Sequence, residues 1–364
     1  MRCKMTDPRP LIPEPRSPIK VLIVEDSPVA RQFLTYVLAS DPAIQVVGTA
    51  NNGVEALKSL EKNRPDDITM DIHMPMMDGF EATRRIMETV PTPIVIVSGS
   101  TGANEIASTF RAIEAGALAV VRRPPGINHK EFEAGSRELI QTVKLMSEVK
   151  VVKRFTRPGK IRVAGPVPIA PQVTGTGKIQ AVAIGASTGG PPVLKNILSG
   201  LPRDFPVPVL IVQHIAQGFV KGFTEWLSDV SRFPVSVASQ GERAAPGHGY
   251  VAPDDFHMGL EKGPNITLSD NAPENRLRPS VSYLFRSAAH VLGPAAVGVL
   301  LTGMGRDGAE ELKAMKDQGA ITIAQDEESS VVHGMPGEAI KLGAATYVLS
   351  PEGITALLAE LVKK

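Results

Sequence analysis

The sequence contains almost no cysteine. Cys3 is the single one among 364 residues, so an internal disulfide framework is excluded, and we expect a reducing, cytoplasmic environment. The formal net charge is only +1, which gives no global attraction to nucleic acid or to anionic lipid. No apolar run is long enough to span a bilayer, so membrane insertion is not expected. The stretch before Ile19 has five prolines and no apolar core, which argues against a signal peptide.

A chain of this length is too long for one ordinary core and predicts two domains. Residues 1–18 are rich in proline and polar side chains, and we expect a disordered arm there. Residues 151–178 are rich in proline, glycine and basic side chains and are interpreted as a linker. The two predicted domains are therefore residues 19–150 and residues 179–364.

Both predicted domains show the pattern of α/β proteins. Short aliphatic runs alternate with segments of helical periodicity, which indicates parallel sheets with crossover helices. In residues 19–150 the aliphatic runs are IKVLIV, IQVVGTA, ITMDI, PIVIVSG and ALAVV. For residues 179–364 we expect a doubly wound, mostly parallel sheet, with an antiparallel excursion around residues 235–270.

Three acidic residues follow predicted strands of the first domain. Glu25 and Asp26 end the first strand, and Asp71 ends the third. The carboxyl ends of parallel strands meet at one edge of a sheet, so these carboxylates should share a pocket. Two carboxylates about 4 Å apart repel by roughly 4 kcal/mol at an effective dielectric of 20, so the cluster needs a cation. An all-oxygen site of this kind suits Mg²⁺.

On these residues, the segment from Ile19 to Lys150 resembles response-regulator receiver domains. The resemblance implies a flavodoxin-like domain with a five-stranded parallel sheet in the order 2-1-3-4-5. It also implies phosphorylation of Asp71 by a chemotaxis histidine kinase. Mg²⁺ would be held by Glu25, Asp26, Asp71 and the backbone carbonyl of His73.

The same resemblance implies two switch residues, and the chain departs from the family at two positions. Ser98, at the end of the fourth strand, corresponds to the hydroxyl that contacts the phosphoryl group. Arg123 stands where the family usually has lysine, and Val120 stands at the position of the aromatic switch residue. Arginine can pair with phosphate, but it does not reproduce the point charge of lysine.

In the second domain, the segment VAIGASTGG places a serine in a turn of small residues after an apolar run. Three interpretations are open: Ser187 is a nucleophile on a strand-to-helix turn, the glycines bind a phosphate, or the segment is only a tight turn. His214 ends the next strand-like run, and Asp307 follows a later one. If these runs are parallel neighbours, the three side chains meet as nucleophile, general base and orienting acid.

Other interpretations of the same residues have to be weighed. GASTGG fits neither of the glycine patterns that bind nucleotide phosphates, and a histidine follows the second strand where a ribose-binding acid would be expected. Both observations favour hydrolysis over phosphate binding. Asp307 alone could be a helix N-cap, and six other histidines could compete with His214. The order Ser, His, Asp also differs from that of the α/β-hydrolases.

Residues 179–364 resemble the catalytic domain of the chemotaxis protein-glutamate methylesterases. The matching segments are AIGASTGGP, IVQHI, GYVAPDDFHM, RPSVSYLF, VLLTGMGRDGA and AITIAQDEESSVVHGMP. The resemblance implies Ser187, His214 and Asp307 as the catalytic residues and the backbone amide of Met304 as part of an oxyanion hole. Leu277 stands where the family often has histidine.

The expected function follows from both resemblances. They imply a phosphorylation-regulated hydrolase that demethylates glutamyl γ-methyl esters, and deamidates glutamines, on the cytoplasmic helices of methyl-accepting chemoreceptors. The esterase reaction would need no cofactor. The alternative is a response regulator with a non-catalytic, ligand-sensing or DNA-binding output domain. Against DNA binding, residues after 178 show no helix-turn-helix pattern and no basic cluster.

Overall fold

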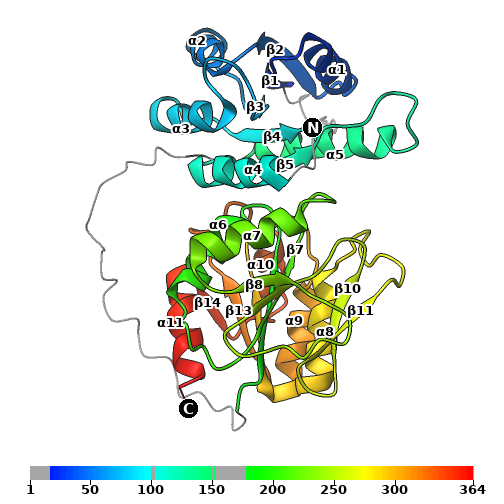
Figure 1. Ribbon diagram of the computed structural model, residues 1–364, viewed down its shortest axis with the longest axis vertical. Coiled ribbons are helices and arrows are strands. Elements are labelled where there is room, and N and C mark those ends of the chain that lie inside the picture. Colours follow the sequence, from blue (N-terminus) through cyan, green and yellow to red (C-terminus); the bar gives the residue numbers. More distant parts are fainter. Residues whose placement is uncertain (1–16, 100–102, 150, 152–177, 364) are drawn as a thin grey trace, which may run out of the picture.

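The computed structural model describes residues 17–99, 103–149, 151 and 178–363, without the side chains of residues 103–108. Two α/β units lie one above the other, each with a sheet between helices (Figure 1). The predicted arm (1–18) and linker (151–178) lie almost wholly outside the described residues. Among the described helices, none has the length and apolar character needed to cross a membrane.

The first unit contains one five-stranded sheet in the order β2-β1-β3-β4-β5 with all neighbours parallel, as predicted. Its interior strands are almost wholly buried, and apolar clusters fill both faces of the sheet. Its elements are β1 (Ile19–Val24), α1 (Pro28–Ala39), β2 (Ile44–Ala50), α2 (Gly53–Asn63), β3 (Asp67–Met70), α3 (Gly79–Thr89), β4 (Ile94–Ser98), α4 (Ala103–Ala115), β5 (Ala119–Arg122) and α5 (Phe132–Met146).

The second unit contains a seven-stranded sheet in the order β14-β13-β12-β6-β7-β9-β8. Its strands are β6 (Ala181–Ala186), β7 (Val209–Gln213), β8 (Val235–Val237), β9 (Gly249–Val251), β12 (Ala296–Leu300), β13 (Ile321–Gln325) and β14 (Tyr347–Leu349). Every pair in this sheet is parallel. The predicted antiparallel excursion is confined to a separate hairpin of β10 (His257–Glu261) and β11 (Asn265–Ser269).

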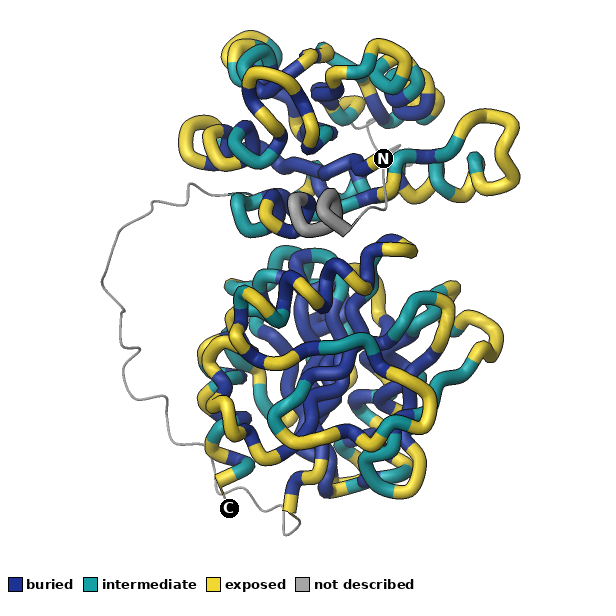
Figure 2. Tube along the Cα trace, in the orientation of Figure 1, coloured by how far each residue is buried: buried dark blue, intermediate teal, exposed yellow. Residues whose placement is uncertain are grey.

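Helices cover both faces of the seven-stranded sheet, as expected for a doubly wound fold. One apolar cluster involves α6 (Gly190–Gly200), α7 (Val220–Ser231) and α11 (Pro351–Leu361). The opposite cluster involves α8 (Val281–Leu292), α9 (Ala309–Asp317) and α10 (Met335–Lys341); the short helix η1 (Gly293–Ala295) leads into β12. The central strands are buried and the outer helix faces are exposed (Figure 2). This burial on both faces explains why the strands are continuous aliphatic runs.

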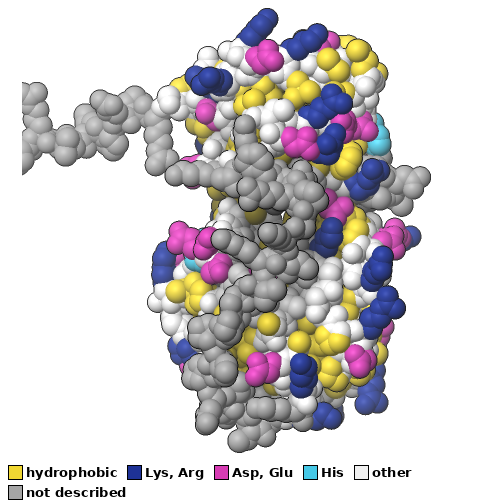
Figure 3. Space-filling model, turned by 90° about the vertical axis from the view of Figure 1, so that its left-hand side faces the viewer, with side chains coloured by type: hydrophobic (Ala, Val, Ile, Leu, Met, Phe, Trp, Pro, Cys, Tyr) yellow, Lys and Arg dark blue, Asp and Glu magenta, His cyan; other side chains and the backbone are white. Residues whose placement is uncertain are grey.

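The two units contact each other through α4 of the first unit. Phe110 is fully buried, and its ring centroid lies 5.3 Å from that of Phe223 and 5.2 Å from that of Trp226, both on α7. Beside this aromatic contact, Glu114 on α4 forms an ion pair with Lys195 on α6. On the visible part of the face in Figure 3, basic and acidic side chains are interspersed, without a patch of one sign.

Candidate active site and phosphoacceptor site

The predicted catalytic residues follow three neighbouring strands. β6 pairs with β7 on one side and with β12 on the other. Ser187 comes directly after β6, His214 comes directly after β7, and Asp307 lies in the loop between β12 and α9. The backbone joins these segments, since Ser187 N donates to Thr302 O (3.0 Å) and His214 N donates to Ala186 O (2.9 Å). The three residues therefore lie at one edge of the sheet.

His214 and Asp307 form a direct pair. The Nε2 atom of His214 lies 3.0 Å from Oδ2 of Asp307, and their side chains are only 11% and 3% exposed. This contact uses one ring nitrogen of His214 and leaves Nδ1 for a proton from another group. His214 and Ser187 line the same cavity, but no hydrogen bond joins the Ser187 hydroxyl to the imidazole in this arrangement of the described residues. Such contacts are often long before substrate binds.

Asp307 is held by groups to which the sequence patterns assigned no role. Its Oδ1 accepts hydrogen bonds from Ser280 Oγ (2.8 Å) and Asn275 Nδ2 (3.2 Å), and its Oδ2 accepts one from Val281 N (2.7 Å). Burial alone would raise the pKa of Asp307, but the hydrogen bond and charge of His214, with the hydrogen bonds of Ser280 and Ser282, hold that pKa below its usual value. The motif RPSVS contains Ser280 and Val281, but its link to Asp307 arises only in the folded chain.

The turn that carries Ser187 is tightly packed. Gly189 adopts φ 77°, a conformation that glycine accepts without strain, and α6 begins at the next residue. Gly303 lies against the serine, since a Cβ there would lie 2.7 Å from Ser187 Cβ. The peptide that follows Gly303 leads to Met304, whose side chain is 47% exposed and lines a hollow beside Arg137 of α5. The backbone before Met304 is therefore next to the serine, as an oxyanion role requires.

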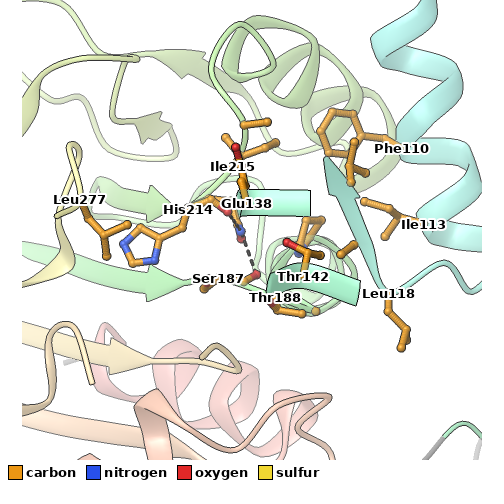
Figure 4. A pocket seen from close by; sticks show the side chains of 16 residues that line it. Phe110, Ile113, Leu118, Glu138, Thr142, Ser187, Thr188, His214, Ile215 and Leu277 are labelled. Carbon is orange, nitrogen blue, oxygen red and sulfur yellow. Dashed lines mark hydrogen bonds between the residues drawn. The ribbon is translucent and has the colours of Figure 1, made fainter. Parts of the chain in front are cut away.

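The cavity at Ser187 has a volume of about 240 Å³ and is lined by both units (Figure 4). The second unit contributes Ser187, Thr188, Gly189, Pro191, Gln213, His214, Ile215, Ala216 and Leu277. The first unit contributes Phe110, Ile113, Leu118, Ala119, Val120, Glu138 and Thr142. Glu138 lies on α5 and lines this cavity, and burial raises its pKa. The first unit thus covers the candidate catalytic residues.

The three predicted metal ligands of the first unit meet at the end of its sheet. One ligand oxygen from each of Glu25, Asp26 and Asp71 lies within 4.8 Å of the others. Burial and the neighbouring Asp71 raise the pKa of Glu25 to about 7, although Arg123 opposes the shift. Burial also raises the pKa of Asp71. Carboxylates this crowded are suited to a hard cation with oxygen ligands such as Mg²⁺.

The predicted switch residues surround this carboxylate cluster. Arg123 places Nη1 3.2 Å from Glu25 Oε2, so the guanidinium pairs with a candidate metal ligand. His73 lines the same pocket, and Ser98 is buried at the end of β4 beside Gly99, which also lines it. Val120 packs partly against the apolar cluster of the second unit and lines the Ser187 cavity. Val120, at the position usually held by an aromatic switch residue, therefore contacts the second unit at the Ser187 cavity.

Two buried glutamines were also missed by the sequence patterns. Gln213 and Gln325 are the last residues of β7 and β13 and are 3% and 0% exposed. The side-chain amides of both form hydrogen bonds with the loops that follow the strands. Nothing in the runs LIVQH and ITIAQD distinguishes such a residue from an ordinary strand end.

Both units match known protein families. Residues 21–129 match the response regulator receiver domain and residues 182–358 match the CheB methylesterase. Two protein-glutamate methylesterases/protein-glutamine glutaminases, from Nitrosospira multiformis and Syntrophus aciditrophicus, are 58% and 57% identical over 94% of this chain, which covers 97% and 98% of their lengths. The solved catalytic domain of Thermotoga maritima CheB is 40% identical over 50% of this chain and 99% of its own, with a TM-score of 0.49. The chain belongs to the CheB family of receiver-linked methylesterases.

Proposed function

We propose that this chain removes methyl groups from glutamyl γ-methyl esters of chemoreceptors and deamidates receptor glutamines. The observation that carries the proposal is the buried His214–Asp307 pair, in which His214 lines the same cavity as Ser187. The three residues follow three neighbouring strands. We assign residues 179–364 to the catalytic domain, residues 19–150 to the receiver and residues 151–178 to the linker between them.

Each side chain has a definite role in the proposed reaction. Ser187 Oγ attacks the ester carbonyl while His214 takes its proton, and Asp307 stabilises the imidazolium that results. The oxyanion is stabilised by the Met304 amide and by amides at the start of α6, where the helix dipole is positive. The imidazolium then protonates the leaving methoxide, and methanol departs. Water, activated by His214, hydrolyses the acyl-enzyme to free serine and a glutamate; ammonia is the leaving group for glutamine.

We propose that the receiver controls this reaction by covering the cavity. A chemotaxis histidine kinase would phosphorylate Asp71, and the phosphoryl group, with a charge of about −1.5 to −2, would favour another arrangement of the β4 and β5 ends. Mg²⁺, when bound, would neutralise charge on the transferring phosphoryl group. Glu25, Asp26, Asp71 and the His73 carbonyl would hold it, while Ser98 and Arg123 would contact the phosphoryl oxygens. Since Val120 of β5 lines the cavity, a change there can loosen the cover.

The test is methanol release from methylated receptor membranes, with and without a small acyl phosphate as phosphodonor. Wild-type protein should release methanol faster with the phosphodonor. Ser187→Ala should remove the release in both conditions, and Asp71→Asn should remove only the stimulation. Near-normal release by folded Ser187→Ala protein would exclude Ser187 as the nucleophile. Stimulation that survives Asp71→Asn would exclude Asp71 as the phosphoacceptor.

A further inference from the structure

Gln213 contacts the backbone of both Ser187 and His214, the two residues that exchange a proton in the proposed reaction. It is the last residue of β7, its side chain is 3% exposed, and the next residue is His214. Its Nε2 donates one hydrogen bond to the backbone oxygen of Ser187 (2.8 Å) and one to that of His214 (2.8 Å). A single amide group therefore ties the nucleophile's own peptide to that of the general base.

These bonds join segments beyond the end of the regular sheet. The last pair in register between β6 and β7 is Ala186 with Gln213, so the turns that carry Ser187 and His214 lie outside the ladder. The Gln213 side chain supplies the next cross-connection between these two turns. Ser187 O also accepts a hydrogen bond from Gly190 N (2.8 Å), so the same carbonyl links the amide to the start of α6.

The orientation of the Gln213 amide is fixed by its partners. Both acceptors of Nε2 are carbonyl oxygens, so a flipped amide would place Oε1 against them. In the observed orientation Oε1 is buried and has no hydrogen-bond partner among the described residues. It lies close to Gly190, where a Cβ would be 2.2 Å away. A buried, unsatisfied acceptor costs stability, and an apolar side chain of similar size would avoid that cost. Packing alone therefore does not account for an amide here.

We propose that Gln213 is a positioning residue for the esterase reaction: it fixes the Ser187 turn relative to His214 so that the serine can pass its proton to the imidazole. The inference rests on the proposed function. Gln213 is not catalytic, because its amide nitrogen donates to backbone oxygens and its amide oxygen is buried beside Gly190. Ser187 Oγ and the imidazole are not yet hydrogen-bonded, so their final approach depends on how the two turns are held. A misplacement of 1 Å can cost about 100-fold in rate.

The experiment uses full-length protein with Gln213→Met, which keeps the length of the side chain and removes both donors. With receptor membranes and phosphodonor, we expect kcat to fall by about 10–100-fold while KM stays within about twofold of wild type. The rate at which a fluorophosphonate labels Ser187 should fall by a similar factor. The labelling is a direct readout of the serine–histidine geometry, which a merely structural residue would leave unchanged in folded protein.

Two variants complete the test. Gln213→Glu has the same shape but cannot donate while ionised, so it should resemble Gln213→Met near neutral pH and recover part of its labelling rate as the carboxyl is protonated. Gln217→Met is the matched control, because Gln217 is exposed on the same loop and its amide binds Asp255 rather than either turn; its kcat should be that of wild type. A thermal unfolding transition for each variant establishes that it is folded. If Gln213→Met does not fold, Gln213→Glu is compared with wild type in its place.

The inference is overturned if folded Gln213→Met, or Gln213→Glu near neutral pH, keeps wild-type kcat and labelling rate. It is also overturned if only KM changes, or if Gln217→Met loses as much activity. These outcomes are distinct from failure of the proposed function, in which the wild-type protein itself would release no methanol and would not be labelled at Ser187.

Discussion

His214 and Asp307 are 93 residues apart in the chain, and yet Nε2 of the first lies 3.0 Å from Oδ2 of the second. The contact is possible because β7 and β12 flank β6, so the segments that follow them share one edge of the sheet. The carboxylate is fixed in turn by Ser280 Oγ and Val281 N. The position of the Asp307 carboxylate is thus determined by the start of α8 as well as by the loop that contains Asp307.

The first prediction concerns Asp307→Asn. The amide keeps the size of the side chain but removes the charge that stabilises the imidazolium, so we expect kcat for methanol release to fall by about 10²–10⁴-fold. Asp317→Asn is the control, because Asp317 is 59% exposed at the end of α9 and should leave kcat unchanged. Asp307→Asn protein that is folded and retains more than half of wild-type activity would show that the pair has no part in catalysis.

The second prediction concerns the pH dependence of stability. The pKa of Asp307 is lower in the folded protein than its value of about 3.9 in an unfolded chain. A lowered folded-state pKa gives stabilisation that is present above the unfolded pKa and is lost as pH falls through the folded one. The difference in free energy of unfolding between wild type and Asp307→Asn should therefore be constant from pH 7 to about pH 5. It should shrink below about pH 4.

Urea unfolding followed by the fluorescence of Trp226, the single tryptophan of the chain, measures this difference. Trp226 lies on α7 of the catalytic unit, so the signal reports on the unit that contains Asp307. A difference that stays constant down to pH 3, or that grows as the pH falls, would contradict the prediction.

The third prediction concerns Gly303→Ala. The added methyl group would lie 2.7 Å from Ser187 Cβ and 2.5 Å from Met335 Sδ, and Met335 is fully buried. The loop before Met304 must then move away from the serine, so the oxyanion donor is displaced; the loss of one such donor costs about 10²–10³ in kcat. Gly353→Ala, in α11, is the control, because its nearest neighbour is 3.3 Å away. Equal kcat for the two variants would remove the Gly303 loop from the mechanism.

The strands of both sheets and several site residues could be predicted from the sequence, because they depend on local residue patterns. Aliphatic runs marked the strands of both sheets, and the residues directly after them, such as Ser187 and Asp71, fall at the sheet edges because parallel strands share a direction. β8 and β9 were not predicted as parallel members of the main sheet, since they are only three residues long; β9 joins the sheet by pairing with β7, and β8 joins it only through β9.

The partners of the site residues could not be predicted for a different reason. The bonds from Ser280 to Asp307 and from Arg123 to Glu25 join residues 27 and 98 positions apart. Which residues become hydrogen-bond partners over such distances is decided by how whole helices and strands pack. A long side chain such as that of Arg123 can also reach several acceptors, so its partner is not fixed by its position in the sequence. The amide of Gln213 acts on backbone oxygens, which every residue has, so no residue pattern marks its targets.

The last prediction concerns the contact that holds the receiver over the cavity. Glu114 on α4 pairs with Lys195 on α6, and the two side chains are 27% and 38% exposed. A partly exposed pair of this kind contributes about 0.2–1 kcal/mol, and Glu114→Lys would replace it by a repulsion. The closed arrangement should then be less populated, so the unphosphorylated protein should release methanol about 2–5-fold faster than wild type. Lys195→Glu should have the same effect.

Exchanging both charges tests whether the pair itself is responsible. In the double variant Glu114→Lys with Lys195→Glu, an attractive pair is restored in the opposite sense, and basal activity should return close to the wild-type value. Activity in the presence of phosphodonor should differ little among the four proteins, because the cover is then already loosened. Single variants with wild-type basal activity would show that this ion pair does not hold the receiver. A double variant as active as the singles would mean that the charges act elsewhere than on each other.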